Sequence, residues 1–286
     1  MASRKADIVA IDIGGTKIEA ILWRAGKILV TQKIPTPKNK HDFFNAVYSV
    51  AESLNAKGQA RAIGISLAGA VDFRTGTVIN SPNLRFLEGT NVQKTVEHKL
   101  KLQTLVENDT RCFLLGEVRF GSAKGKKNVI GMILGTGLGG AIYLNGQMVL
   151  GMHGFAGEQG RVKIAIDSHV YSIEELIASH GFARLGVTDP LDCQNKAFAG
   201  DRKSIAVYNK IGRLLGLHLA NLTELFDPEL IIIGGGISRA GNLLLDPAFS
   251  EMKKRVAVPK KYWPEIRVSK LKNAGLLGAV ALVENS

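Results

Sequence analysis

The chain has 286 residues, 45% of them hydrophobic, and a formal net charge of +12 at pH 7. Its length and hydrophobic content suffice for one large core or two lobes, and no run of about 18 apolar residues predicts a membrane span. Two cysteines, Cys112 and Cys193, are too few for a disulfide framework, so we expect a reducing cytoplasm.

Residues 6–34 predict three consecutive strands, and the N-terminus enters the first of them without a signal-like apolar region. Residues 9–17 (VAIDIGGTK) carry Asp12, Gly14, Gly15, Thr16 and Lys17 at the end of that first strand. Glycine lets backbone N–H groups approach a ligand, the carboxylate can hold a hydrated divalent cation, and the hydroxyl and ammonium can bind phosphate oxygens. A plain hairpin turn is the competing interpretation, because glycine pairs are common there.

A helix over 42–54 and strands near 61–67 and 103–107 follow in chain order. Asp109 then lies at the end of the last of these strands and at the predicted N-cap of the next helix. Aspartate is a favoured cap, which would be a purely structural role. The same position can also hold a carboxylate at the mouth of a cleft, where ligands bind in open α/β sheets.

Two further glycine clusters end predicted strands. Residues 135–140 (GTGLGG) follow the apolar segment 129–134 and precede a returning strand, and Gly234–Gly236 follow the segment 230–233. Three such clusters at wide separation are hard to explain as unrelated turns. The repeated pattern suggests an internal duplication.

These elements predict an α/β protein of two lobes with a cleft between them. Residues 1–110 form the small lobe and residues 111–273 the large one, which includes a long helix near 204–225. A final helix over 274–286 is expected to pack back on the first lobe.

The motifs together resemble those of the ROK family (repressor, open reading frame, kinase) of bacterial sugar kinases. The resemblance rests on residues 12–17 (DIGGTK), 65–69 (ISLAG), 81–84 (SPNL), 107–109 (END), 135–140 (GTGLGG), 154–158 (GFAGE) and 233–236 (IGGG), which occur in the family's order. It implies the two-lobed actin-like ATPase (ribonuclease H-like) fold, with mixed sheets flanked by helices. It also implies a homodimeric, ATP- and Mg²⁺-dependent kinase acting on glucose, a related hexose or an N-acetyl amino sugar.

The resemblance also assigns roles to individual residues. Asp109 would be the general base that accepts a proton from the attacking sugar hydroxyl, and Asp12 would orient magnesium, directly or through water. The sugar ligands would be Gly69, Asn83, Asn108, Asp109, Glu158, Arg161 and Glu174. Nucleotide binding would use Asp12, Gly14, Gly15, Thr16, Lys17, Gly135, Thr136, Gly137, Gly139, Gly235 and Gly236.

Some of these assignments have local alternatives. Asn83 lies in Ser-Pro-Asn, which is also turn chemistry, and Glu174 suits the first turn of a helix, where the macrodipole favours a carboxylate. Arg161 stands where the family has a histidine, and it can reach a sugar hydroxyl or pair with a nearby carboxylate. The family's zinc-binding cysteines are missing and His169 alone cannot hold the metal, so we predict no structural zinc.

The basic charge requires a decision about nucleic acid. Lysines and arginines are scattered and lack interleaved aromatic residues, so we expect no nucleic-acid binding and no membrane binding. Two other functions stay open: a sugar-sensing regulatory protein without turnover, and a polymerising actin-like filament protein. Asp109 disfavours the sensor, because binding alone does not require a placed base.

Overall fold

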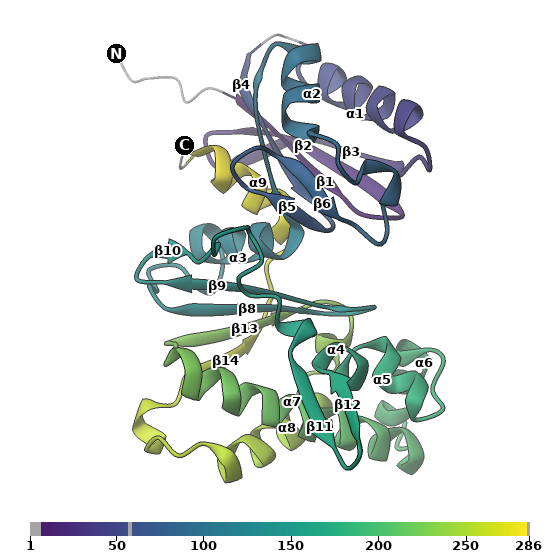
Figure 1. Ribbon diagram of the computed structural model, residues 1–286, viewed down its shortest axis with the longest axis vertical. Coiled ribbons are helices and arrows are strands. Elements are labelled where there is room, and N and C mark those ends of the chain that lie inside the picture. The colour runs from purple at the N-terminus through teal and green to yellow at the C-terminus, as the bar shows by residue number, and fades with distance from the viewer. Residues whose placement is uncertain (1–6, 57–58, 285–286) are drawn as a thin grey trace. The chain divides into compact units, whose positions relative to one another are not determined.

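The computed structural model describes residues 7–56 and 59–284 (Figure 1). The first residues, which bear on the expected lack of a signal segment, and the last two of the predicted C-terminal helix lie outside this range. No helix in the described part of the chain is both long and apolar enough to cross a membrane. Cys112 and Cys193 are both buried free thiols.

The chain divides into two compact units. The first comprises residues up to 124, residues 150–156 and the segment from 271 onward, and the second comprises residues 125–149 and 157–270. The sequence analysis drew its boundary at residue 110, whereas the first unit extends through the helix that follows Asp109.

The first unit contains a five-stranded mixed sheet, in which β2 runs antiparallel to β1 and β4 runs parallel to it. The three expected N-terminal strands are present. In spatial order the strands are β3 (Lys27–Pro35), β2 (Lys17–Arg24), β1 (Asp7–Ile13), β4 (Ala60–Leu67) and β7 (Gln103–Asn108).

Helices cover both faces of this sheet, because side chains of β1 alternate between two cores. Val9 and Ile11 pack with α1 and α2, whereas Ile8 and Ala10 pack with α9. Figure 1 shows α1 and α2 on one side of these strands and α9 on the other. The remaining elements of the unit are α1 (Lys40–Leu54), the hairpin β5 (Ala70–Asp72) and β6 (Thr77–Asn80), the 3-10 turn Arg85–Leu87, α2 (Val92–Leu100), α3 (Asp109–Phe120) and α9 (Ala274–Glu284).

Glycines let α9 approach its neighbours closely. A Cβ at Gly278 would lie 1.7 Å from the carbonyl oxygen of Cys112 on α3, and one at Gly64 would lie 2.1 Å from that of Ala279. Only hydrogen fits at such backbone contacts. The last helix is therefore part of the first unit's core.

The second unit repeats the same sheet topology. Its strands, in the corresponding order, are β10 (Gln147–Met148), β9 (Leu138–Leu144), β8 (Val129–Leu134), β13 (Leu230–Gly234) and β14 (Glu265–Val268). β9 runs antiparallel to both β10 and β8, whereas β13 runs parallel to both β8 and β14.

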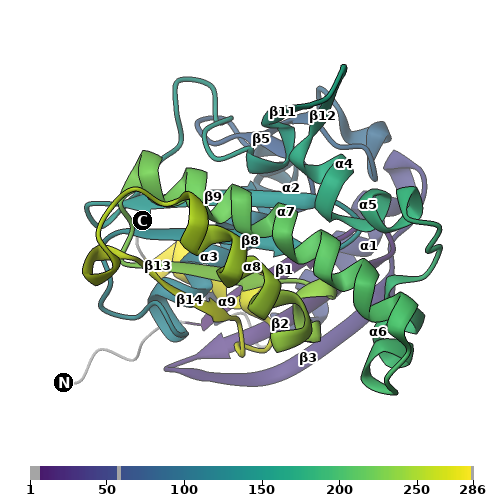
Figure 2. The ribbon, with the colours of Figure 1, turned by 90° about the horizontal axis from the view of Figure 1, so that it is seen from below.

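Its core lies between this sheet and the long helix α7, which Figure 2 shows side by side with α8. Ile130 and Ile231 of the sheet share that core with Leu215 and Leu219 of α7 and Leu244 of α8. The other elements are the 3-10 turn Gln159–Arg161, the hairpin β11 (Lys163–Ile166) and β12 (His169–Ser172), α4 (Ile173–Ile177), α5 (Ser179–Arg184), α6 (Pro190–Phe198), α7 (Arg202–Phe226), the 3-10 turns Ile237–Ala240 and Lys260–Tyr262, and α8 (Asn242–Arg255).

Candidate active site

Asp12 lies near the end of β1 and is held by two other segments of the first unit. Its Oδ1 accepts a hydrogen bond from the Ser66 hydroxyl on the adjacent strand β4 at 2.6 Å. A Cβ at Gly275, in the first turn of α9, would lie 3.1 Å from the same oxygen. Burial raises the pKa of Asp12, and the Ser66 hydrogen bond opposes that shift.

The glycine turn after Asp12 is closed by backbone and side-chain bonds. The Gly14 N–H donates to the Lys17 carbonyl at 3.0 Å. A Cβ at Gly15 would lie 2.7 Å from the Cβ of Asn83, so the turn and the predicted sugar ligand are neighbours. Thr16 is exposed, and the Lys17 ammonium pairs with Glu19 at 2.7 Å. The phosphate-binding roles of Thr16 and Lys17 stay predictions.

The turn between β7 and α3 fixes Asn108 and Asp109. The N-cap of α3 is Asn108, one residue earlier than the sequence analysis predicted, because its Oδ1 accepts from the N–H groups of Thr110 and Arg111 at 3.0 and 3.1 Å. Its Nδ2 donates to the Gly69 carbonyl at 2.9 Å and to Asp109 Oδ1 at 3.0 Å. The Thr110 N–H also donates to Asp109 Oδ1, at 2.8 Å. The structure thus brings Gly69, Asn108 and Asp109 together.

Arg111 supports this turn and was missed by the sequence analysis. Its buried guanidinium pairs through Nε with Glu107 Oε1 at 2.7 Å, and Nη1 donates to the Gly154 carbonyl at 2.7 Å. Glu107 Oε1 also accepts from the Asn108 N–H at 2.6 Å. A charged residue at the start of a helix that is otherwise largely apolar was the available signal, because arginine is seldom fully buried without a partner.

The glycine loop of residues 135–140 in the second unit is held by α4 and α5. The Glu174 carboxylate on α4 accepts from the Leu138 N–H at 2.8 Å, and a Cβ at Gly137 would lie 2.6 Å from the same oxygen. Ser179 donates to the Gly135 carbonyl through both its N–H and its hydroxyl, at 3.1 Å each. Glu174 lies in the first turn of α4 and anchors the loop, and its sugar-binding role stays a prediction.

A pocket of about 240 Å³ lies beside this loop within the second unit. Its lining brings together two of the predicted glycine clusters, through Gly135, Thr136 and Gly236. Gly235 has φ +93°, and a Cβ there would lie 2.2 Å from the Leu134 carbonyl oxygen. Glycine is therefore required at that turn, where the chain leaves β13.

Glu158 precedes a 3-10 turn of the second unit, and Arg161 is the last residue of that turn. The Arg161 guanidinium lies 3.2 Å from Glu158 Oε2, which is the carboxylate pairing left open by the sequence analysis. The hairpin of β11 and β12 occupies residues 163–172, within the segment where the resemblance places the zinc cysteines.

Within residues 7–56 and 59–284, no cluster of three or more histidine, cysteine, aspartate or glutamate side chains is placed to hold a metal ion. A single part-buried carboxylate such as Asp12 does fit magnesium, because that ion keeps several waters and binds through one or two carboxylates plus substrate phosphates. The prediction that no zinc is bound stays a prediction.

Comparison with known proteins identifies the family. The ROK family model matches residues 8–286. A glucokinase from Streptomyces coelicolor is 32% identical, with 96% of each chain covered, and an N-acetyl-D-glucosamine kinase from Photobacterium profundum is 28% identical, with 86% of this chain and 88% of that protein covered. A crystal structure of a ROK family glucokinase from Streptomyces griseus, in complex with glucose and AMPPNP, has a TM-score of 0.82 at 29% identity and covers 98% of this chain and 100% of that one.

The chain therefore belongs to the ROK family. The predicted fold class, an α/β protein of the actin-like ATPase type with mixed sheets flanked by helices, is confirmed. The cleft predicted between the lobes stays a prediction.

Proposed function

We propose that this protein is an ATP-dependent hexose kinase that transfers the γ-phosphoryl group of ATP to a hydroxyl of glucose, a related hexose or an N-acetyl amino sugar. The observation that carries the proposal is the Asn108–Asp109 turn, which places a fixed carboxylate beside an amide and the Gly69 carbonyl. The glucokinases and N-acetyl-D-glucosamine kinases among its relatives support it.

Asp109 acts as the general base. Its Oδ1 is oriented by the Thr110 N–H and the Asn108 amide, so the carboxylate is held in one direction before substrate arrives. A carboxylate held in this way accepts the proton of the sugar hydroxyl as that oxygen attacks phosphorus. Asn108, Gly69, Asn83 and Glu158 provide the donors and acceptors that sugar hydroxyls require.

The nucleotide is bound mainly by backbone groups. The glycines of residues 135–140 and of the Gly235–Gly236 turn carry no Cβ that would keep a phosphate away from the backbone, and the same holds for Gly14 and Gly15 in the first unit. Asp12 would hold magnesium, directly or through water, and the bound ion would supply positive charge to neutralise the phosphates. The glycine turns and Asp12 also position the phosphates and exclude water from them.

A coupled assay with a panel of sugars tests the proposal. Phosphorylation of glucose, mannose or an N-acetyl amino sugar supports the kinase, with EDTA abolishing the activity by removing magnesium. Sugar binding without turnover would instead support a sensor, and ATP-dependent sedimentation would support a filament. A homodimer and the lack of nucleic-acid binding are part of the same proposal, tested by light scattering and by a mobility-shift assay.

A further inference from the structure

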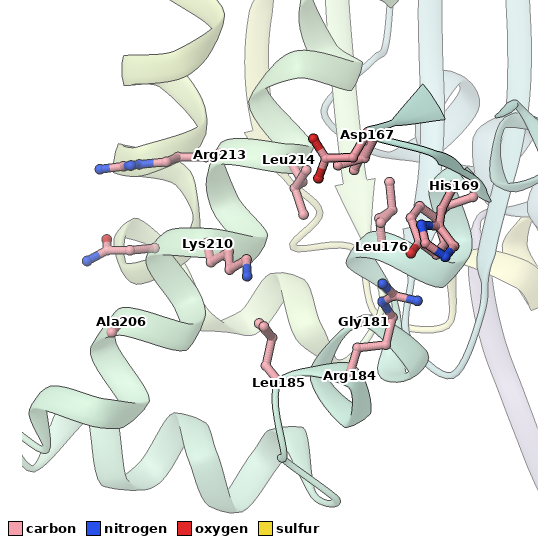
Figure 3. Close-up of a pocket in the computed structure, with 13 residues that line it drawn as sticks. Asp167, His169, Leu176, Gly181, Arg184, Leu185, Ala206, Lys210, Arg213 and Leu214 are labelled. Carbon is pink, nitrogen blue, oxygen red and sulfur yellow. The ribbon is translucent and has the colours of Figure 1, made fainter. Parts of the chain in front are cut away.

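A second pocket of the second unit lies outside the candidate active site. It has a volume of about 770 Å³ and is formed by the β11–β12 hairpin, α4, α5 and α7 (Figure 3). Pockets of roughly 300–1,000 Å³ hold small organic ligands. None of the residues predicted for the sugar or the nucleotide lines it.

The pocket is lined by more positive than negative charge. Arg184, Lys210 and Arg213 are its cations, and Asp167 is its single acidic residue. In Figure 3 the side chains of Lys210 and Arg184 extend toward the same space, Asp167 reaches toward it from the hairpin, and Arg213 points away. A ligand in that space therefore meets two cations and, at another side, one carboxylate.

The two converging cations are not neutralised by the protein. Across the described residues, neither Arg184 nor Lys210 forms an ion pair within 4.0 Å of a carboxylate. Arg184 instead lies over the ring of Tyr171, with 4.0 Å from its central carbon to the ring centroid. The charge of Glu175 acts on Arg184, but that carboxylate is bound by the Ser172 N–H and hydroxyl at 2.6 Å each.

This chemistry selects a particular class of ligand. A guanidinium held against a ring presents its N–H edge in a fixed direction, and together with an ammonium it suits the several oxygens of a phosphate group. Asp167 suits hydroxyl donors, and the apolar side chains of Leu176, Leu185 and Leu214 suit a carbon skeleton. We propose that the pocket binds a sugar phosphate, with the phosphate at Arg184 and Lys210 and the hydroxyls toward Asp167.

The same helices connect this pocket to the glycine loop. Leu176 of α4 lines the pocket, and Glu174 of the same helix holds the Leu138 N–H. Gly181 and Arg184 of α5 line the pocket, and Ser179 at its start holds the Gly135 carbonyl. Occupation of the pocket therefore changes the affinity of the loop for nucleotide, and nucleotide changes the affinity of the pocket by the same factor. This coupling rests on the proposed function, whereas the binding itself does not.

Isothermal titration of the full chain with glucose 6-phosphate tests the binding. Lys210→Ala and Arg184→Ala should each weaken it about 10-fold or more, since each removes a charged hydrogen bond. The matched control Lys203→Ala removes an exposed lysine of α7 that does not line the pocket, and it should leave the affinity unchanged. Asp109→Asn should also retain binding, which separates this pocket from the active site.

The ligand class is tested with citrate, inorganic phosphate and glucose as further probes. We expect inorganic phosphate to bind more weakly than glucose 6-phosphate, and glucose binding to be unaffected by Lys210→Ala. Equal binding of citrate, no binding at millimolar concentration, or unchanged affinity in both pocket variants would overturn the proposal. An AMPPNP affinity that glucose 6-phosphate does not change would overturn the coupling. If the enzyme phosphorylates sugars but the pocket does not bind, or binding is not coupled to nucleotide, the proposed function is unaffected and this inference fails. If the pocket binds glucose 6-phosphate but no sugar is phosphorylated, the proposed function fails and the binding inference is retained.

Discussion

The two units have the same strand order but carry different residues at the ends of their central strands. In the first unit Asp12, Ser66 and Asn108 lie at or near the ends of β1, β4 and β7. In the second unit the corresponding strands β8 and β13 end in Leu134 and Gly234 and are followed by glycine turns.

The same sheet topology can therefore present either polar side chains or exposed backbone groups at the ends of its central strands. Carboxyl ends of parallel strands meet at one edge of a sheet, so both units offer a place for polar groups there. Under the proposed function, the strand ends of the first unit contribute side chains that carry charge and accept protons. Those of the second unit contribute backbone groups that a ligand can approach closely. At these strand ends, an uncharged isostere should therefore lower turnover most in the first unit, and an added methyl group should weaken nucleotide binding most in the second.

The largest expected effect is that of Asp109→Asn in the first unit. Removal of the proton acceptor should lower kcat by roughly two to four orders of magnitude and leave AMPPNP affinity in place. A coupled assay and calorimetry measure the two quantities. Asp42→Asn, at an exposed position in the first turn of α1, is the control. Turnover within a few-fold of wild type would show that Asp109 is not the base.

Arg111→Met should have the second-largest effect, a loss of stability, because it leaves the buried Glu107 carboxylate without its cation. Loss of one partner of a buried pair costs about 3–5 kcal/mol of unfolding free energy, measurable with urea. Glu107→Gln combined with Arg111→Met should cost less than the sum of the single changes. Among variants that fold, Arg111→Lys should raise KM for sugar more than KM for ATP, because Arg111 supports the Asn108 turn. Equal changes in both constants would contradict this positioning role.

Gly235→Ala probes the second unit. Its φ of +93° and the clash with the Leu134 carbonyl should together cost about 1–3 kcal/mol or more of unfolding free energy and weaken AMPPNP binding. Gly236→Ala is a matched control one residue away, because no atom lies within 4 Å of its added Cβ and its φ is −65°. Similar stability losses in the two variants would argue against a special turn at Gly235.

The smallest expected effect is a shift in pH dependence. Ser66→Ala removes the hydrogen bond that lowers the pKa of Asp12, so burial should raise that pKa further. Magnesium binds the ionised carboxylate, and the magnesium concentration required for half-maximal activity should therefore rise as pH falls. In Ser66→Ala that rise should begin at a higher pH than in wild type. Superimposable profiles would place magnesium elsewhere.

Long periodic segments made most of the fold predictable from sequence. The three N-terminal strands, α1 and α7 each have enough residues to show a period, the final helix is a continuous apolar segment, and the glycine clusters mark where strands end. Short elements such as β5, β6, β11 and β12 have no more than four residues each, which is too few for a pattern.

Site residues whose contacts lie within a few positions along the chain were predictable from the sequence. Those whose contacts come from segments distant in the sequence were not. Ser66 meets Asp12 only because β4 lies beside β1, and Gly275 does so only because α9 returns to the same unit. The shift of the cap from Asp109 to Asn108 has a local cause. Both residue types cap helices, and the direction of the Asn108 side chain decides between them.

The glycine contacts of α9 have a consequence for how this chain matures during translation. The ribosome makes the segments that carry Asp12 and Asp109 early, yet α9, which completes the core of their unit, is made only after the whole second unit. The second unit, whose segments lie between residues 125 and 270, can condense before that helix exists. The first unit, which contains Asp12 and Asp109, is thus completed after the second, and its core can form only once the residues of α9 have been translated.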